Sequence, residues 1–394
     1  MNTNDSQEQS ANSGLIPVAE NDTTIAEIEQ DRIAIATPRQ LMWWKFRKHR
    51  LAIISSFVLI IFYILALFAD FISPMDPNAY DAAYKFVPPM AITFIDENGD
   101  LRPQPGVNGL ISNRDPETLK ITYEVDENTW YPIHFFVKGV PYKLLGFIEA
   151  DIHLFGLGEE AGGLPIALMG TDRLGRDMFS RILYGARISL SIGLISVLLS
   201  LTLGIILGGI SGYYGGWIDN VIQRLIEFLR SIPTLPLWMA LSAALPPDWP
   251  QTRRYFGITI ILSMIAWTSL GRQVRGRFLA LRNEDFVLSA RLTGARDMRI
   301  INRHMVPSFT SHIIASLTLS IPGIILAETA LSFLGLGLRQ PVISWGVLLQ
   351  EAQNIRTVAL APWLLMPGLA VVIVVLAFNF LGDGLRDAAD PFTR

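Results

Sequence analysis

The chain has 394 residues, of which 51% are hydrophobic and 17% are charged, and its formal net charge is −3. Soluble domains carry about 25% charged residues, so this composition excludes an ordinary soluble domain and indicates a membrane protein. Cysteine is absent, which excludes disulfide bonds and thiolate metal sites.

Residues 1–38 are polar and poor in aromatic side chains, and such segments seldom bury enough apolar surface to fold, so we expect a disordered cytoplasmic tail. Residues 39–69 form an interfacial segment and a first span, because an apolar run over residues 51–69 reaches about 28 Å as a helix. The cations before the run place the N-terminus in the cytoplasm. The aromatic and cationic residues are Trp43, Trp44, Lys45, Arg47, Lys48 and Arg50.

Residues 70–170 contain no second run long enough to cross a bilayer, so we expect them outside the cell membrane. They carry six Lys or Arg and fifteen Asp or Glu. Asp-Glu-Asn-Gly-Asp at residues 96–100 favours a tight turn, residues 119–125 and 133–137 are strand-like, and residues 138–141 predict another turn. These patterns predict a small β-rich extracytoplasmic insertion. The alternative is an irregular loop.

Residues 171–187 have apolar side chains at near-helical spacing, which predicts an interfacial helix. Four cations on the outer side oppose the tendency of such residues to stay in the cytoplasm. Placing them inside would require an extra crossing that the sequence does not offer. The four cations are Arg173, Arg176, Arg181 and Arg187.

Residues 188–382 predict an apolar core with five further spans, which gives a polytopic all-α membrane protein with six transmembrane helices. Gly204 and Gly208 in the second span suit a close helix contact, whereas Pro233 and Pro236 should bend or break the third. The fifth contains Glu328. Both termini, including residues 383–394, are then cytoplasmic. The five spans are residues 188–210, 225–245, 255–270, 312–336 and 363–381, and residues 337–361 re-enter the membrane or lie outside.

Residues 271–307 form the one long basic stretch, which separates the fourth and fifth spans. Eight arginines stand against three acidic residues, a formal balance of +5, so the stretch belongs in the cytoplasm. We interpret it as a docking loop for a cytoplasmic partner; binding to anionic lipid headgroups is the alternative. The arginines are residues 272, 275, 277, 282, 291, 296, 299 and 303, and the acids are Glu284, Asp285 and Asp297.

Two short helices are predicted inside this stretch. Residues 285–293 form the first, and Gly294 ends it because a left-handed backbone conformation suits glycine. Asp297 caps the second helix, and Pro307 ends it before the membrane. Their apolar residues are Phe286, Val287 and Ala290 in the first and Ile300, Ile301 and Met305 in the second.

Here the sequence resembles the inner-membrane permease subunits of binding-protein-dependent ABC importers. Their signature loop reads E-A-A, three residues, G, and about a dozen positions later an apolar residue and Pro. Ala290, Gly294, Val306 and Pro307 match this pattern, while Leu288 stands at the acidic position. Three other stretches resemble the dipeptide and oligopeptide branch: residues 170–190, residues 328–338 with Ser-Trp-Gly at 344–346, and residues 378–391.

The resemblance implies a non-catalytic permease in the cell inner membrane, which carries peptides or peptide-like solutes; nickel and opines are alternatives. It implies a heterodimer with a homologous second permease subunit and contact with membrane lipid but not with nucleic acid. It also implies two cytoplasmic ATPase subunits, which bind ATP and magnesium, and an extracytoplasmic substrate-binding protein. This sequence itself contains no G-x-x-x-x-G-K-[ST] phosphate loop.

Two groups of candidate site residues follow. The ATPase-coupling group comprises Asp285, Phe286, Val287, Ala290, Gly294, Ala295, Ile300, Ile301 and Pro307. The candidate translocation-path group comprises Glu328, Ser332 and Asn379, although Glu328 also suits a structural hydrogen bond. A proton-coupled transporter using Glu328 and Glu227 and a membrane-anchored sensor are the alternatives to an importer. The spacing of His and acidic residues predicts no metal site.

Overall fold

The computed structural model describes residues 37–114, 116–117 and 121–389. The tail predicted to be disordered lies outside the described residues, except for its last two, Thr37 and Pro38. Pro38 begins α2 (Pro38–Lys48), and the Thr37 hydroxyl accepts a hydrogen bond from the Gln40 amide and caps this helix.

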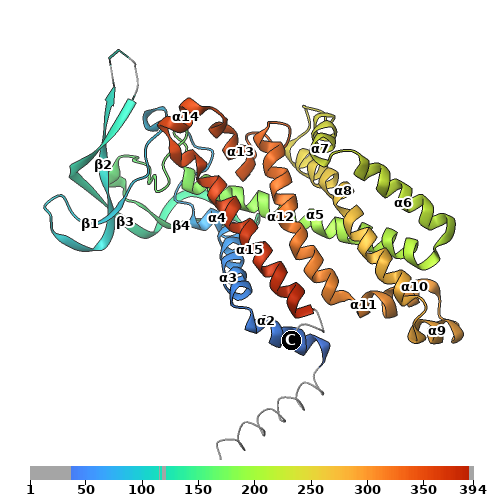
Figure 1. Cartoon of the computed structure of the whole chain (residues 1–394). Coiled ribbons are helices and arrows are strands. Elements are labelled where there is room, and N and C mark those ends of the chain that lie inside the picture. The colour runs from blue at the N-terminus through green and yellow to red at the C-terminus, as the bar shows by residue number, and fades with distance from the viewer. Residues whose placement is uncertain (1–36, 115, 118–120, 390–394) are drawn as a thin grey trace, which may run out of the picture.

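Five helices among the described residues are long and apolar enough to span a membrane. They are α3 (Arg50–Leu67), α5 (Met178–Tyr214), α8 (Gln251–Leu281), α12 (Thr310–Phe333) and α15 (Met366–Ala389). Figure 1 shows them side by side in one bundle. The chain is therefore a multi-pass membrane protein, with five long spanning helices where six were predicted.

The predicted third span, residues 225–245, is divided between two shorter helices. α6 (Gly216–Ser231) ends before Ile232, and α7 (Thr234–Ala243) begins after Pro233. Ile232 has an extended ψ of 132°, as expected for a residue before proline. Pro233 has ψ 130° and is the N-cap of α7, a position that is normally not helical. The predicted break is present, and the single span is not.

Three predicted helix boundaries are wrong because the helices continue beyond the apolar runs. Residues 171–177 are not helical, and α5 then runs unbroken from Met178, so no separate interfacial helix exists. α8 extends to Leu281 and includes the first part of the basic stretch. α15 continues through the predicted stop at residues 382–384.

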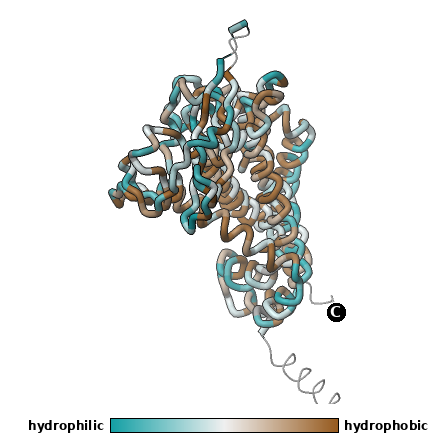
Figure 2. The backbone as a smooth tube through the Cα atoms, turned by 90° about the vertical axis from the view of Figure 1, so that its left-hand side faces the viewer, coloured by the Kyte–Doolittle hydropathy of each residue, from teal (hydrophilic) through white to brown (hydrophobic). Residues whose placement is uncertain are grey.

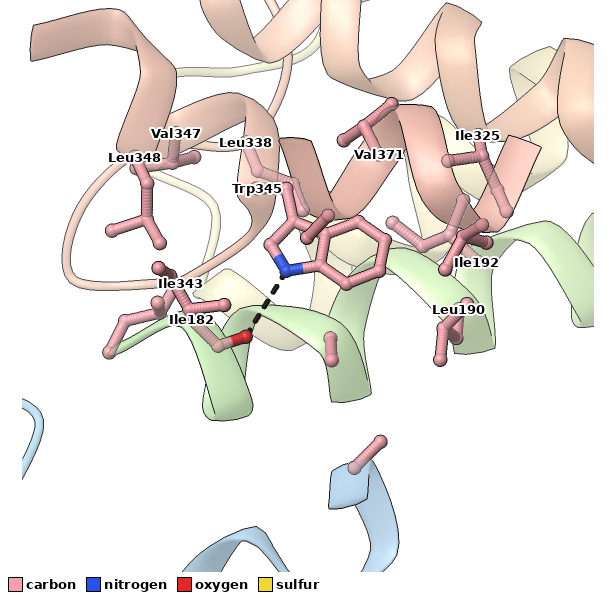
Figure 3. Packing of buried hydrophobic residues seen from close by; sticks show 14 of the residues in the cluster. Ile182, Leu190, Ile192, Ile325, Leu338, Ile343, Trp345, Val347, Leu348 and Val371 are labelled. Atoms are coloured by element: carbon pink, nitrogen blue, oxygen red, sulfur yellow. Dashed lines mark hydrogen bonds between the residues drawn. The ribbon is translucent and has the colours of Figure 1, made fainter. Parts of the chain in front are cut away.

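The main core lies between α5, α8, α12 and α15. Trp345 in α13 (Trp345–Leu349) has no exposed surface, and its indole N–H donates to the Ile182 carbonyl at 3.1 Å (Figure 3). The loop that carries it is thus folded into the bundle. α14 (Ile355–Leu360) follows on the way to α15.

The predicted close helix contact at Gly204 and Gly208 is confirmed, and its partner is α8. A Cβ atom added to Gly208 would lie 2.4 Å from the Gly271 carbonyl oxygen, and one added to Gly204 would lie 2.9 Å from Leu270. Any residue with a Cβ atom would collide with α8 at these positions. The two glycines therefore allow α5 and α8 to pack at this short distance.

A four-stranded antiparallel sheet occupies the segment between α4 (Ala69–Ile72) and α5. Its strands lie in chain order: β1 (Ile92–Ile95), β2 (Leu101–Arg114), β3 (Ile121–Leu144) and β4 (Ile148–Leu157). Val87, Met90, Val107, Ile133 and Ala167 form a small core under it.

The turn at residues 96–100 joins β1 to β2 as predicted. Asp96 Oδ1 accepts from the amides of Asn98 and Asp100, and Gly99 has φ +80°. The turn predicted at residues 138–141 is instead an irregularity inside β3, where the register shifts between Lys138 and Tyr142. The chain reverses later, around Gly146.

The sheet and the basic stretch lie at opposite ends of the helical bundle (Figure 1). α2 and the C-terminal end of α15 lie on the side away from the sheet. Figure 2 shows the most hydrophobic segments gathered between these ends.

Candidate functional site

The loop between α8 and α12 has its own hydrophobic core. α9 (Asp285–Leu292), α10 (Asp297–Ile300) and α11 (Val306–Ser308) fold against the ends of α5 and α8. Phe278 of α8 packs edge-on against Phe309, with ring centroids 5.8 Å apart. The loop is therefore a compact unit continuous with two long helices. Its fully or nearly fully buried side chains include Val274, Phe278, Val287, Ile300 and Met305.

The predicted coupling residues divide into an inner and an outer set. Val287, Ala290, Ile300 and Ile301 are buried in this core, so they hold the loop together and present no surface to a partner. Ala295 is half-buried. Asp285, Phe286, Gly294 and Pro307 are exposed.

Three large exposed apolar side chains in the loop were missed by the sequence reasoning. Leu288, Leu292 and Met298 are 41%, 89% and 56% exposed, comparable with Phe286 at 40%. Leu288 and Leu292 are four positions apart on α9 and therefore share a face. This four-residue spacing is the sequence pattern from which the exposed apolar face could have been predicted.

Gly294 ends α9 as predicted. Its φ is +77°, its amide donates to the Arg291 carbonyl, and the Ala295 amide donates to the Ala290 carbonyl. This pair of bonds is the Schellman arrangement that satisfies the last carbonyls of a helix. A Cβ at Gly294 would meet nothing within 4 Å, so the backbone conformation alone demands glycine.

Asp297 does not cap α10 with its side chain, contrary to the prediction. Its carboxylate accepts from the hydroxyls of Tyr213 at 2.7 Å and Tyr214 at 3.2 Å, at the end of α5. The Arg291 guanidinium lies 4.8 Å over the Tyr213 ring. Both loop helices are thus tied to α5. Pro307 also lies within α11 instead of ending it, and the helical path is interrupted at Phe309.

Asp219 and Arg275 form a second tie that the sequence reasoning missed. Two hydrogen bonds of 2.5 Å join the guanidinium to both carboxylate oxygens, and the Ser211 hydroxyl donates to the same carboxylate. Hydrogen bonding from Arg275 lowers the pKa of the Asp219 carboxyl. Within the described residues, Arg275 is the only one of the eight loop arginines in an ion pair.

Glu328 and Ser332 have no exposed surface. The Glu328 carboxylate accepts from the hydroxyls of Ser332 and Ser344 at 2.8 Å and of Ser189 at 3.3 Å. This carboxylate therefore joins α12 to α5 and to the start of α13, which favours the structural alternative. Asn379 is half-buried on α15, and its path role stays a prediction.

The arginines before and within the start of α5 are paired. Arg176 contacts Asp172 at 2.7 Å and Glu351 at 3.1 Å, and Arg181, only 1% exposed, lies 3.7 Å from Asp172. Arg187 contacts Asp70 at 2.8 Å.

Two acidic groups beside these arginines have raised pKa values. Burial raises the pKa of Asp177, the N-cap of α5, to about 6, and burial also raises the pKa of Glu351. In the part of the chain that the structure describes, no three His, Cys, Asp or Glu side chains are grouped to hold a metal ion.

Two family models match this chain. The model described as "Binding-protein-dependent transport system inner membrane component" matches residues 200–394, and the model described as "N-terminal TM domain of oligopeptide transport permease C" matches residues 37–89.

Named relatives are similar over most of their own length. The chain is 43% identical over 231 residues to the oligopeptide transport system permease protein OppC of Salmonella typhimurium, covering 57% of this chain and 72% of that protein. It is 40% identical over 227 residues to the dipeptide transport system permease protein DppC of Bacillus subtilis, covering 57% and 68%. It is 31% identical over 356 residues to DppC of Haemophilus influenzae, covering 90% and 95%.

Proposed function

This chain belongs to the family of binding-protein-dependent transport system inner-membrane components, and from that premise we propose that it forms half of the translocation path of an ATP-driven importer. A homologous second permease subunit forms the other half. Peptides or peptide-like solutes, delivered by an extracytoplasmic binding protein, are the substrates, in line with the named function of its relatives. Nickel and opines are the alternative substrates.

The observation that carries this proposal is the construction of the α9–α11 loop. An outer surface of Phe286, Leu288, Leu292 and Met298 stands on a buried core that is continuous with α5 and α8. Exposed apolar side chains close to one another mark a protein interaction site, and α9 carries Phe286, Leu288 and Leu292 on its eight residues. An ATPase subunit, which holds ATP and magnesium, is the partner we assign to this surface. Movement of that subunit would then displace α5 and α8 with the loop.

The arrangement of the ends supports a cytoplasmic loop and extracytoplasmic sheet. The loop arginines at positions 272, 277, 296, 299 and 303 are exposed, and exposed cations beside spans remain in the cytoplasm. α2 and the end of α15 lie away from the sheet (Figure 1), which supports cytoplasmic termini.

The geometry of the carboxylates favours an importer over a proton-coupled transporter. Glu328 is fully bonded to serine hydroxyls, and Glu227 pairs with Arg224 at 2.9 Å on the surface of α6. A relay of protons needs carboxylates that face water or one another. Glu328 has no exposed surface, and Glu227 pairs with Arg224 and not with Glu328.

The test is uptake by proteoliposomes that contain the chain with its partner subunits. We expect ATP to drive uptake and Gly294→Val to reduce it about tenfold or more, because a side chain with φ near +77° costs about 1–2 kcal/mol. Gly294→Asn is the matched control, since Asn tolerates this conformation. Uptake driven by a proton gradient without ATP, or normal uptake by Gly294→Val, would contradict the proposal.

A further inference from the structure

The turn between β3 and β4 carries four apolar side chains, two on each side of Gly146. Leu145, Phe147 and Ile148 are 45%, 73% and 46% exposed, and Leu144 pairs with Ile148 across the strands. Directly behind them, Lys143 and Glu149 lie 3.6 Å apart and are both exposed. We call Leu144, Leu145, Gly146, Phe147 and Ile148 the hairpin tip.

The hairpin tip lies against two spanning helices. A cavity of about 350 Å³ separates it from α3 and α5, and most of the cavity wall is apolar. Its lining comes from the tip (Leu145 and Gly146), from α3 (Tyr63, Ala66 and Leu67) and from α5 (Arg187, Leu190, Ser191 and Leu194).

The ion pair between Arg187 and Asp70 marks where the apolar part of both helices ends. Leu194 lies seven positions beyond Arg187 on α5, and Tyr63 lies seven positions before Asp70 near the end of α3. At 1.5 Å per residue, both are about 10 Å on the membrane side of the pair. The positions on α3 and on α5 therefore agree that the cavity wall facing the tip reaches about 10 Å into the apolar part of the helices.

We propose that the hairpin tip inserts into the membrane leaflet on the side of the sheet, and that an acyl chain of a phospholipid occupies the cavity between the tip, α3 and α5. Ile60, Ile61 and Ile64, which precede or follow the lining residue Tyr63 on α3, are 53%, 54% and 48% exposed, so this helix presents further apolar surface beside the cavity. The Lys143–Glu149 pair then lies at the headgroup level, where charged side chains at an interface are placed.

The backbone of the tip suits a water-poor environment. The Gly146 amide donates to the Lys143 carbonyl at 3.0 Å, and the Phe147 amide donates to the Leu144 carbonyl at 3.3 Å. These bonds matter because an unsatisfied backbone group is costly in lipid. The same rule limits the insertion to the tip, since β4 is an edge strand.

The part of the β3–β4 hairpin away from the tip contacts α4, which directly follows α3. A ring nitrogen of His153 on β4 lies 2.6 Å from the Ser73 carbonyl oxygen just after α4, and Phe136 of β3 lies 6.2 Å from Phe71 of α4, centroid to centroid. The tip is therefore held at a set depth beside α3.

The absence of cysteine allows a direct test on the full-length chain. Phe147→Cys and, as the second variant, Leu145→Cys are labelled with an environment-sensitive nitrobenzoxadiazole dye and reconstituted into phosphatidylcholine vesicles. Asn98→Cys in the β1–β2 turn, at the opposite edge of the sheet, is the matched control. Phosphatidylcholine with a doxyl group at carbon 5 of the acyl chain reports lipid contact, and iodide reports water contact.

We expect blue-shifted emission and several-fold stronger doxyl quenching at positions 147 and 145 than at 98, with the reverse order for iodide. Equal iodide quenching at all three positions would overturn the proposal. Blue-shifted emission without doxyl quenching would also overturn it and would assign the tip to a protein contact. This measurement needs neither ATP nor partner subunits. It depends only on the spanning helices, so its failure is distinct from a failure of the transport proposal.

Discussion

Two arginine-rich segments lie at opposite ends of the bundle and use the same side chain differently. In residues 173–187 all four arginines contact carboxylates, and Arg176 and Arg181 are buried. In residues 271–307 most of the eight arginines are exposed. Arg176 and Arg181 of the first segment are part of the folded core, whereas the second segment carries most of its arginines on the surface.

The difference teaches that a count of cations near a span does not by itself assign a side of the membrane. Cations that stay solvated follow the tendency to remain in the cytoplasm. The arginines of the first segment are instead paired with Asp172, Glu351 and Asp70, residues that are distant from one another in sequence. Substitutions in the first segment should therefore lower stability, whereas substitutions of exposed arginines in the second should mainly affect binding of a partner.

The largest effect is expected for Asp172→Asn. This nearly isosteric change leaves Arg176 and Arg181 without the carboxylate between them, and removal of one partner from a buried ionic group costs about 3–5 kcal/mol. Thermal unfolding of the purified chain, followed by the fluorescence of its nine tryptophans, measures the loss. Glu284→Gln in the loop is the control, and an equal unfolding temperature for both variants would erase the distinction between the segments.

A pH effect of up to about 3 kcal/mol is expected at Asp177. Its pKa is raised to about 6 in the folded chain, compared with about 3.9 in the unfolded chain. Protonation of this carboxyl therefore stabilises the folded state. That contribution is complete below pH 4 and is lost as the pH rises through 6. Asp177→Asn keeps the cap and removes this loss. The variant should therefore gain unfolding temperature relative to the wild type between pH 4 and 6.5, and a constant difference over that range would refute the assignment.

Arg275→Ala should have an intermediate effect, because it removes the one ion pair that the loop arginines make with other described residues. Asp219 loses two hydrogen bonds, and since the pair is partly exposed to solvent, we expect a loss of about 1–2 kcal/mol of stability. Arg275→Lys keeps the charge but not the two-pronged geometry and should recover part of the loss. Unfolding temperatures of both variants in detergent provide the measurement. A value for Arg275→Ala as low as that for Asp172→Asn would place Arg275 with the buried arginines.

The smallest effect is expected for Arg299→Gln, at an exposed position on α10. Surface substitutions of this kind change stability by no more than about 0.5 kcal/mol. If the exposed arginines guide an ATPase subunit to the loop, the same variant should weaken binding of that subunit more at low salt than at high salt. A marked loss of thermal stability would show that the exposed Arg299 has a structural role.

Local patterns were sufficient for the features that depend on local physics. The turn at residues 96–100, the helix end at Gly294, the proline break near residue 233 and the close contact at Gly208 each follow from neighbours in sequence. The irregularity of β3 between Lys138 and Tyr142 was mistaken for a turn because Gly139 and Pro141 suit either structure.

Features that depend on residues far apart in the chain could not be predicted from the sequence. Glu328 accepts hydrogen bonds from Ser189 and Ser344, and Asp297 accepts one from Tyr213. No local sequence pattern around these residues predicts their partners. Likewise, Arg187 on α5 pairs with Asp70, which lies 117 positions earlier in the sequence. The division of the coupling residues into buried and exposed sets required the loop core itself.

The unbroken course of α5 has a mechanical consequence. Its 37 residues extend about 55 Å, from the Asp177 cap beside the sheet to Tyr213, which holds Asp297 of the loop. Such a rod behaves as a lever: over this length a tilt of about 5° displaces one end by about 5 Å relative to the other. If a partner subunit displaces the loop, this unbroken helix would carry the movement to the end of the molecule where the buried arginines and Trp345 lie.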